Sequence, residues 1–125
     1  MNRDINSRED LLTIVRDFYE SLFQNEELKH FFEDFKEEKA LEHHLATLVD
    51  FWDNTLFYSG SYKKNAMKPH IMLHDQNPLK NIHFKHWLAL LTKAIDKNFK
   101  GENAETMKNR ALSIATVMKI KFGIE

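Results

Sequence analysis

The residues of this chain that could do chemistry are polar-tipped side chains on apolar helical faces. One such face, between residues 41 and 55, has helical spacing and consists of Leu41, His44, Leu45, Leu48, Phe51, Trp52 and Thr55. His44 lies within this apolar stripe, whereas His43 falls on the polar face of the same segment. A histidine on an apolar face must satisfy two ring nitrogens away from water. His44 is therefore either a core histidine bonded to a nearby carbonyl or a polar group that faces a ligand cavity.

Two further segments repeat this pattern. Tyr19 shares an apolar face with Phe18 and Leu22, and Trp87 shares one with Phe84 and Leu91. A buried phenol or indole needs a hydrogen-bond partner, and three polar tips directed into one small core are more than packing requires. These side chains indicate a cavity that holds a group with a polar or ionic centre.

His70 adds a fourth polar group. It lies in a segment with no helical period, after the basic residues Lys63, Lys64 and Lys68. Residues 61–68 are predicted to form a loop, and one or two helical turns can begin at Pro69. His70 is thus a candidate member of the same cavity.

Helices are predicted to position these groups. Ser7 followed by Asp10 is a capping-box-like start for the helix that carries Tyr19. Asn25 can cap a short second helix that runs through the aromatic residues 31–35. The central helix is predicted over about residues 37–57, with Gly60 as its left-handed stop.

The second half of the chain is also predicted to be helical. Asn77 and Pro78 are expected to start the next long helix, as its N-cap and first residue, and this helix closes near Gly101. The last helix is predicted from about Asn103 to Gly123. No segment has the period of a strand, so the predicted fold class is all-α.

Composition limits the possible functions. The 125 residues are expected to form one domain, residues 1–125, and are 42% hydrophobic and 30% charged with a net charge of −1. Dispersed basic residues argue against binding to nucleic acid or to an acidic membrane surface. No apolar run approaches the roughly 18 residues of a membrane span, and the acidic N-terminus does not resemble a signal peptide. Zero cysteines exclude disulfides, Fe–S ligation and covalent haem attachment, and the expected compartment is the cytoplasm.

Two alternatives to a ligand-binding cavity remain open at this point. His70 and His74, or His83 and His86, have spacings found on metal-ligating helix faces, so a non-haem metal site is one alternative. A di-iron bundle would need recurring Glu-x-x-His motifs, and the chain lacks that recurrence. The other alternative is an interaction module without a cofactor, which would have no reason to bury tyrosine, histidine and tryptophan tips together.

The order of these motifs resembles that of a known family. The chain contains Phe18-Tyr19, His44 seven residues before Phe51-Trp52, Tyr58-x-Gly60, the isolated His70, and His83-Phe84-x-x-Trp87-Leu88. Over residues 8–118 this order and spacing resemble the group III truncated haemoglobins, bacterial haem proteins with a two-over-two helical sandwich.

The resemblance implies a role for each candidate residue. It implies a haem b (iron protoporphyrin IX) with His70 as the proximal iron ligand and with Tyr19, His44 and Trp87 on the opposite, distal side. The residues that it places around the haem are Phe18, Phe32, Leu48, Trp52 and, toward the propionates, Lys68. Leu41 stands where the family commonly has tryptophan, a difference that affects packing rather than ligation.

The same resemblance implies a function in gas chemistry. The ligands expected are O₂, NO, CO or peroxide, because tyrosine and tryptophan donate hydrogen bonds to an oxygen that gains negative charge. Slow O₂ release would favour redox chemistry on O₂, NO or peroxide, in a monomer supplied with electrons by an external reductase. The alternative is a reversible oxygen binder or gas sensor without turnover.

Overall fold

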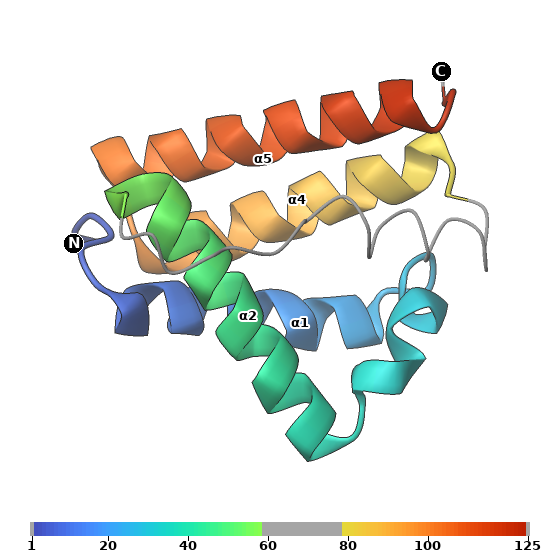
Figure 1. Cartoon of the computed structure of the whole chain (residues 1–125), viewed down its shortest axis with the longest axis horizontal. Helices are drawn as coiled ribbons and strands as arrows, with labels where there is room; N and C mark the ends of the chain where they lie inside the picture. The colour runs from blue at the N-terminus through green and yellow to red at the C-terminus, as the bar shows by residue number, and fades with distance from the viewer. Residues whose placement is uncertain (1, 59–78, 125) are drawn as a thin grey trace.

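The computed structural model describes residues 2–58 and 79–124, and every regular element in this part of the chain is helical. The elements are α1 (Arg8–Gln24), the 3₁₀ helix η1 (Lys29–Phe35), α2 (Glu38–Phe57), α4 (Asn81–Asn98) and α5 (Glu102–Lys121). Figure 1 shows their arrangement. The predicted all-α fold is confirmed.

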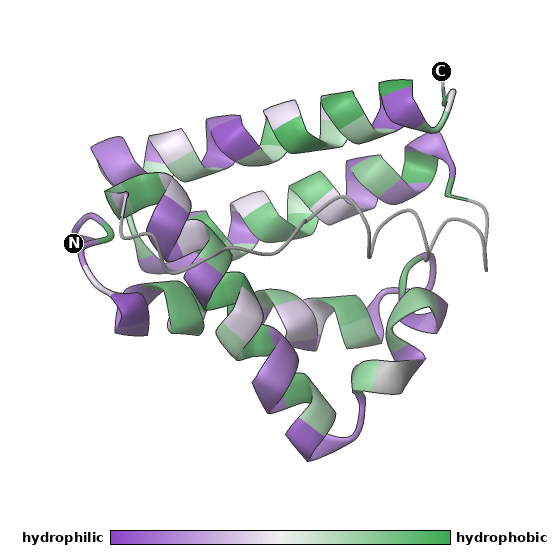
Figure 2. Ribbon diagram, in the orientation of Figure 1, coloured by the Kyte–Doolittle hydropathy of each residue, from purple (hydrophilic) through white to green (hydrophobic). Residues whose placement is uncertain are grey.

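The four long helices pack as two pairs. The helices α4 and α5 run antiparallel and side by side, while α2 crosses α1 obliquely (Figure 1). The two pairs are joined where α1 packs against α4, and η1 contacts both α1 and α2. Each long helix carries apolar residues among hydrophilic ones (Figure 2), and their buried side chains form one core cluster. None of the described helices combines the length and hydropathy needed to cross a bilayer.

Side-chain caps define where α1 and α2 start, and a side-chain hydrogen bond also shapes the turn before η1. The Ser7 hydroxyl accepts a hydrogen bond from the backbone N–H of Asp10 at 3.3 Å, as the sequence predicts. The Asn25 side-chain oxygen accepts from the N–H groups of Glu27 and Leu28, which turns the chain into η1. Glu37 begins α2, since its carboxylate accepts from the N–H groups two and three residues further along.

The predicted bounds of the central helix are confirmed, whereas its predicted left-handed stop and the predicted start of the next long helix differ from the structure. The left-handed residue at the end of α2 is Tyr58, with φ 56° and ψ 36°, and Gly60 lies outside the described residues. The prediction that Asn77 and Pro78 begin the next helix is wrong, because α4 begins at Asn81. There the Lys80 N–H donates to Nδ1 of His83 at 2.9 Å, and the His83 N–H donates to the Lys80 carbonyl at 3.0 Å.

The segment that precedes α1 ties the start of α1 to the start of α5. The Asp4 carboxylate accepts from the N–H groups of Asn103 at 2.9 Å and Ala104 at 3.0 Å, so that it caps α5. Arg3 forms a salt bridge with Asp10 of α1 at 2.6 Å. Asp4 also contacts the turn at Gly101, whose φ of +153° few other residues adopt. Through these contacts the N-terminal segment connects the start of α1 to the start of α5.

Candidate functional site

Tyr19 and His44 form the centre of the candidate site. The Tyr19 hydroxyl on α1 lies 2.6 Å from Nε2 of His44 on α2, a short hydrogen bond between two helices that cross. Only 4% of Tyr19 is exposed, whereas His44 is half-buried. Burial raises the pKa of the Tyr19 phenol far above its ordinary value of 10.0, so the hydroxyl keeps its proton and remains able to donate.

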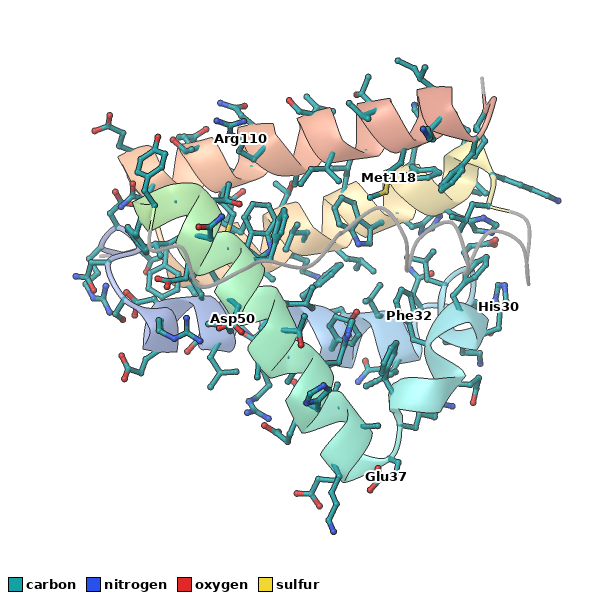
Figure 3. All side chains as sticks on the ribbon, viewed as in Figure 1. His30, Phe32, Glu37, Asp50, Arg110 and Met118 are labelled. Atoms are coloured by element: carbon teal, nitrogen blue, oxygen red, sulfur yellow. The ribbon has the colours of Figure 1, made fainter. Side chains whose placement is uncertain are left out.

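Aromatic rings fix the orientation of Tyr19. The rings that meet it edge-on, at centroid distances of 5.5 to 6.4 Å, are those of Phe18, Phe23, Phe32 and Phe35. Phe32, labelled in Figure 3, reaches α1 from η1 and makes the shortest of these contacts. Edge-to-face geometry is the arrangement that aromatic quadrupoles favour. Tyr19 therefore presents one polar atom from an otherwise apolar environment.

The apolar stripe of α2 divides into two sides. Leu45 and Trp52 are buried in the core, together with Val49 and Leu56, which the predicted stripe did not include. The members that remain half-buried are Leu41, His44, Leu48, Phe51 and Thr55, at helical spacing along one face. His43 is exposed, so the predicted separation of the two neighbouring histidines is confirmed. The half-buried side of α2 is an apolar face with one imidazole in it.

Trp87 of α4 is connected to Tyr19 through the ring of Phe18. It is half-buried, although His83 and Leu91, one turn before and after it, are both buried. Its ring meets the ring of Phe18 edge-on at 6.0 Å, and Phe18 in turn contacts Tyr19. The indole can only donate a hydrogen bond. Contacts through Phe18 thus connect Trp87 with the hydrogen-bonded pair of Tyr19 and His44.

The other predicted site residues have the following positions. Phe18 and Trp52 are buried, whereas Phe32 and Leu48 are half-buried. Trp52 belongs to the core and contacts the ring of Phe51. Lys68 and His70 lie outside the described residues, as do Lys63, Lys64 and His74.

His83 and His86, the other candidate metal-ligating pair, each form a hydrogen bond with a different residue. His83 is buried, and its Nδ1 accepts from the Lys80 N–H. Burial, and secondly the neighbouring His30, lower the pKa of His83 below its ordinary value of 6.5. Nδ1 of His86 lies 3.2 Å from the side-chain nitrogen of Asn25. Within residues 2–58 and 79–124, no group of three or more His, Cys, Asp or Glu side chains could hold a metal ion.

Sequence reasoning missed two aromatic partners of the site. Phe23 was not singled out, although it stands four residues after Tyr19 and thus on the same helical face. Phe35 was predicted only as part of the short aromatic helix over residues 31–35, yet its ring lies flat against His44 at 4.1 Å. Spacing along α1 could have identified Phe23, whereas the Phe35 contact depends on how η1 meets α2.

The donor set and its apolar surroundings suit a flat apolar cofactor with a polar reactive centre. The half-buried face of α2 offers Leu48 and Phe51, and η1 offers Phe32, all outside the fully buried core. Tyr19, His44 and Trp87 are grouped beside this face and can donate hydrogen bonds to a small ligand. A porphyrin needs this combination of apolar contact area and a few directed polar groups.

Comparisons with known proteins identify the family and agree with the fold. The family model described as "Bacterial-like globin" matches residues 4–120. The chain is also similar to the crystal structure of a group III truncated hemoglobin from Campylobacter jejuni, with a TM-score of 0.87 and 22% sequence identity. That match covers 98% of this chain and 95% of the other. A comparison with curated protein sequences finds no match.

Proposed function

This chain belongs to the bacterial-like globin family, a family of haem-binding proteins, and from that membership we propose that it holds one non-covalent haem b. The absence of cysteine from the sequence supports non-covalent binding, because a C-x-x-C-H attachment needs two thiols. We propose His70 as the proximal ligand of the iron and Lys68 as a propionate contact, in a single domain of residues 1–125. Phe18, Phe32, Leu48 and Trp52 are proposed to surround the haem.

The observation that carries the proposal is the hydrogen bond between Tyr19 and His44. It places a protonated phenol and an imidazole side by side, in a fold that matches a truncated globin. A cofactor-free helical module gains nothing from this polar pair beside a half-buried apolar face, since burial of polar groups costs free energy. Trp87 adds a third donor from a different helix.

When bound, haem supplies an iron with an open coordination position for O₂, NO, CO or peroxide, together with its redox chemistry. The protein residues act on the ligand by orienting it and by donating hydrogen bonds to it. Tyr19 holds its proton at physiological pH, and the Trp87 N–H has no other protonation state there. Each hydrogen bond to an oxygen that carries negative charge contributes roughly 1.5–3 kcal/mol.

Several such donors should make the release of O₂ slow. Slow release suits a carrier poorly and suits redox reactions of O₂ with NO, or of peroxide, well. We therefore propose oxygen, nitric oxide or peroxide redox chemistry rather than transport. The protein would act as a cytoplasmic monomer, and an external reductase would supply the electrons.

The cofactor proposal is tested by reconstitution. The purified chain should take up one equivalent of haem, and acid–butanone should extract all of it. Substitution His70→Gly should abolish normal ligation, and added imidazole should restore the Soret band. His74→Ala, only four residues away, is the matched control and should leave the spectrum unchanged. A requirement for His74 instead would overturn the proximal assignment.

The reaction is tested by mixing the oxygenated protein with NO. One nitrate should form for each haem oxidised to the ferric state, and a supplied reductant should sustain turnover. Peroxide activity is assayed in parallel with a reducing substrate. Rapid O₂ release, together with neither nitrate nor peroxide activity, would leave a reversible gas binder or sensor as the function.

A further inference from the structure

Phe35 contacts both members of the hydrogen-bonded pair. Its ring is stacked on that of His44, with centroids 4.1 Å apart and an angle of 14° between the planes. The same ring meets Tyr19 edge-on at 6.4 Å. Phe35 therefore lies against the two residues whose polar atoms are 2.6 Å apart.

The stack matters because His44 is more exposed than Tyr19. Tyr19 is almost fully buried between four phenylalanine rings, whereas His44 is half-buried. Side chains occupy discrete rotamers, and a change of the His44 rotamer that moves Nε2 away from Tyr19 also separates the imidazole from Phe35. An aromatic pair of this kind favours one orientation by roughly threefold to tenfold beyond the effect of the hydrogen bond.

The backbone fixes Phe35 at the required place. Phe35 is the last residue of η1, and the Lys36 N–H donates to the carbonyl of Glu33 at 3.2 Å to close that turn. Two residues after Phe35, Glu37 begins α2 through hydrogen bonds of 3.1 and 2.9 Å to backbone N–H groups (Figure 3 labels Glu37 at this end of α2). The short, capped junction leaves little freedom between Phe35 and the second turn of α2, which carries His44.

We propose that Phe35 is a positioning residue that holds His44 against Tyr19, and that it thereby sets the rate at which small ligands enter the site. The stack itself is independent of any cofactor. Its consequence for ligand entry rests on the proposed haem function. Ligands reach the site faster when His44 leaves Tyr19 more often, so that loss of the stack raises the association rate.

The test uses Phe35→Leu, which keeps apolar bulk and removes the flat ring, and Phe35→Tyr, which keeps the aromatic face. The matched control is Phe99→Leu, because Phe99 is a buried phenylalanine at the end of α4, where its ring lies 5.3 Å from the Arg3 guanidinium. The first measurement is the ¹H–¹³C NMR spectrum of the histidine rings, in the full chain before haem addition and in the diamagnetic CO complex. The His44 signals are assigned with His44→Leu.

Loss of ring-current shielding should move the His44 ring protons downfield in Phe35→Leu, but not in Phe35→Tyr or Phe99→Leu. After flash photolysis, CO should rebind from solvent roughly threefold to tenfold faster in Phe35→Leu and within about twofold of the native rate in the other two variants. Unchanged His44 signals and rates in Phe35→Leu would overturn the proposal.

Two further outcomes are informative. If Phe35→Leu does not fold, the native protein still provides a test: a nuclear Overhauser contact between the Phe35 and His44 rings supports the stack, and its absence overturns it. If the chain takes up no haem, the proposed function fails, while the His44 signals before haem addition still report on the Phe35 contact. The two failures are thus distinguishable.

Discussion

The Tyr19 hydroxyl lies 2.6 Å from Nε2 of His44, so one of these two groups donates its hydrogen to the other. While Tyr19 donates to His44, its proton is not available to a ligand. When His44 carries hydrogen on Nε2, it donates to the Tyr19 oxygen. The Tyr19 O–H can then donate its hydrogen bond to a second partner. The state of one imidazole nitrogen therefore decides whether Tyr19 can bond a bound gas.

The first prediction separates the two neighbouring histidines. His44→Leu removes the hydrogen bond that must break before His44 can leave Tyr19. A bond of this kind contributes about 1 kcal/mol, so CO association should rise by roughly fivefold. His43→Leu, at an exposed position of the same helix, should leave the rate within about twofold. Stopped-flow or flash-photolysis traces decide the matter, and equal responses from both variants would contradict the placement of His44 in the site.

The second prediction concerns the hydrogen-bond donors. Tyr19→Phe or Trp87→Phe should speed O₂ dissociation by roughly tenfold to a hundredfold, because each removes one bond to a charged acceptor. The measurement is displacement of O₂ by CO in a stopped-flow instrument. Bonds within the network can compensate for each other, so the double variant is measured too. A double variant that releases O₂ at the native rate would show that neither residue bonds the ligand.

The sequence predicted the features that depend on local spacing. The cap at Ser7 and the opposite faces of His43 and His44 follow from patterns within one or two helical turns, and both are confirmed. Those patterns also identified Tyr19 and Trp87 as polar tips on apolar faces, and in the structure both contact the ring of Phe18.

The features that sequence missed depend on contacts between distant segments. His83 reaches back to Lys80 and starts α4 there, and no local rule for asparagine followed by proline reveals this. The cap on α5 comes from Asp4, about a hundred residues earlier in the chain, and was not predicted. The stack of Phe35 on His44 depends on the angle between η1 and α2, which tertiary packing determines.

The third prediction tests the contact between the N-terminal segment and α5. A Cβ atom at Gly101 would lie 2.4 Å from Cγ of Asp4, and the φ of +153° is unfavourable for alanine. Gly101→Ala should therefore lower the free energy of unfolding by about 1–3 kcal/mol, or more if Asp4 is displaced from its cap. Chemical denaturation of the two proteins at neutral pH gives this difference.

Gly123→Ala is the matched control for this substitution. Gly123 also has a positive φ, +68°, but nothing lies within 4 Å of a Cβ atom placed there. The control has the milder backbone penalty of the left-handed region and omits the clash, so it should destabilise the protein less than Gly101→Ala. Equal losses in the two variants would show that Asp4 contributes little to the α4–α5 turn.

The last prediction concerns stability in mild acid. His83 is buried and accepts from the Lys80 N–H, which requires an unprotonated Nδ1. Burial lowers the pKa of His83 below 6.5, and the nearby His30, Lys80 and His86 act in the same direction, whereas Glu27 opposes them. As the pH falls through 6.5, the unfolded chain binds a proton at this position before the folded chain does. The contribution of His83 to stability is thus complete above pH 6.5 and is lost as the pH falls below it.

Glutamine separates the titration of His83 from its structural role. His83→Gln keeps an acceptor for the Lys80 N–H, in the arrangement of a capping box, and removes the ionisable group. The fall in melting temperature between about pH 7.5 and about pH 5.5 should therefore be smaller in His83→Gln than in the native protein. His43→Gln, at an exposed histidine, should not change this fall. Asp4 and Asp10 do not affect this comparison. Their pKa values are lowered below 3.8, so their contribution to protein stability is lost only in more acidic solutions. An identical pH dependence in native and His83→Gln proteins would show that His83 is not held neutral by its burial.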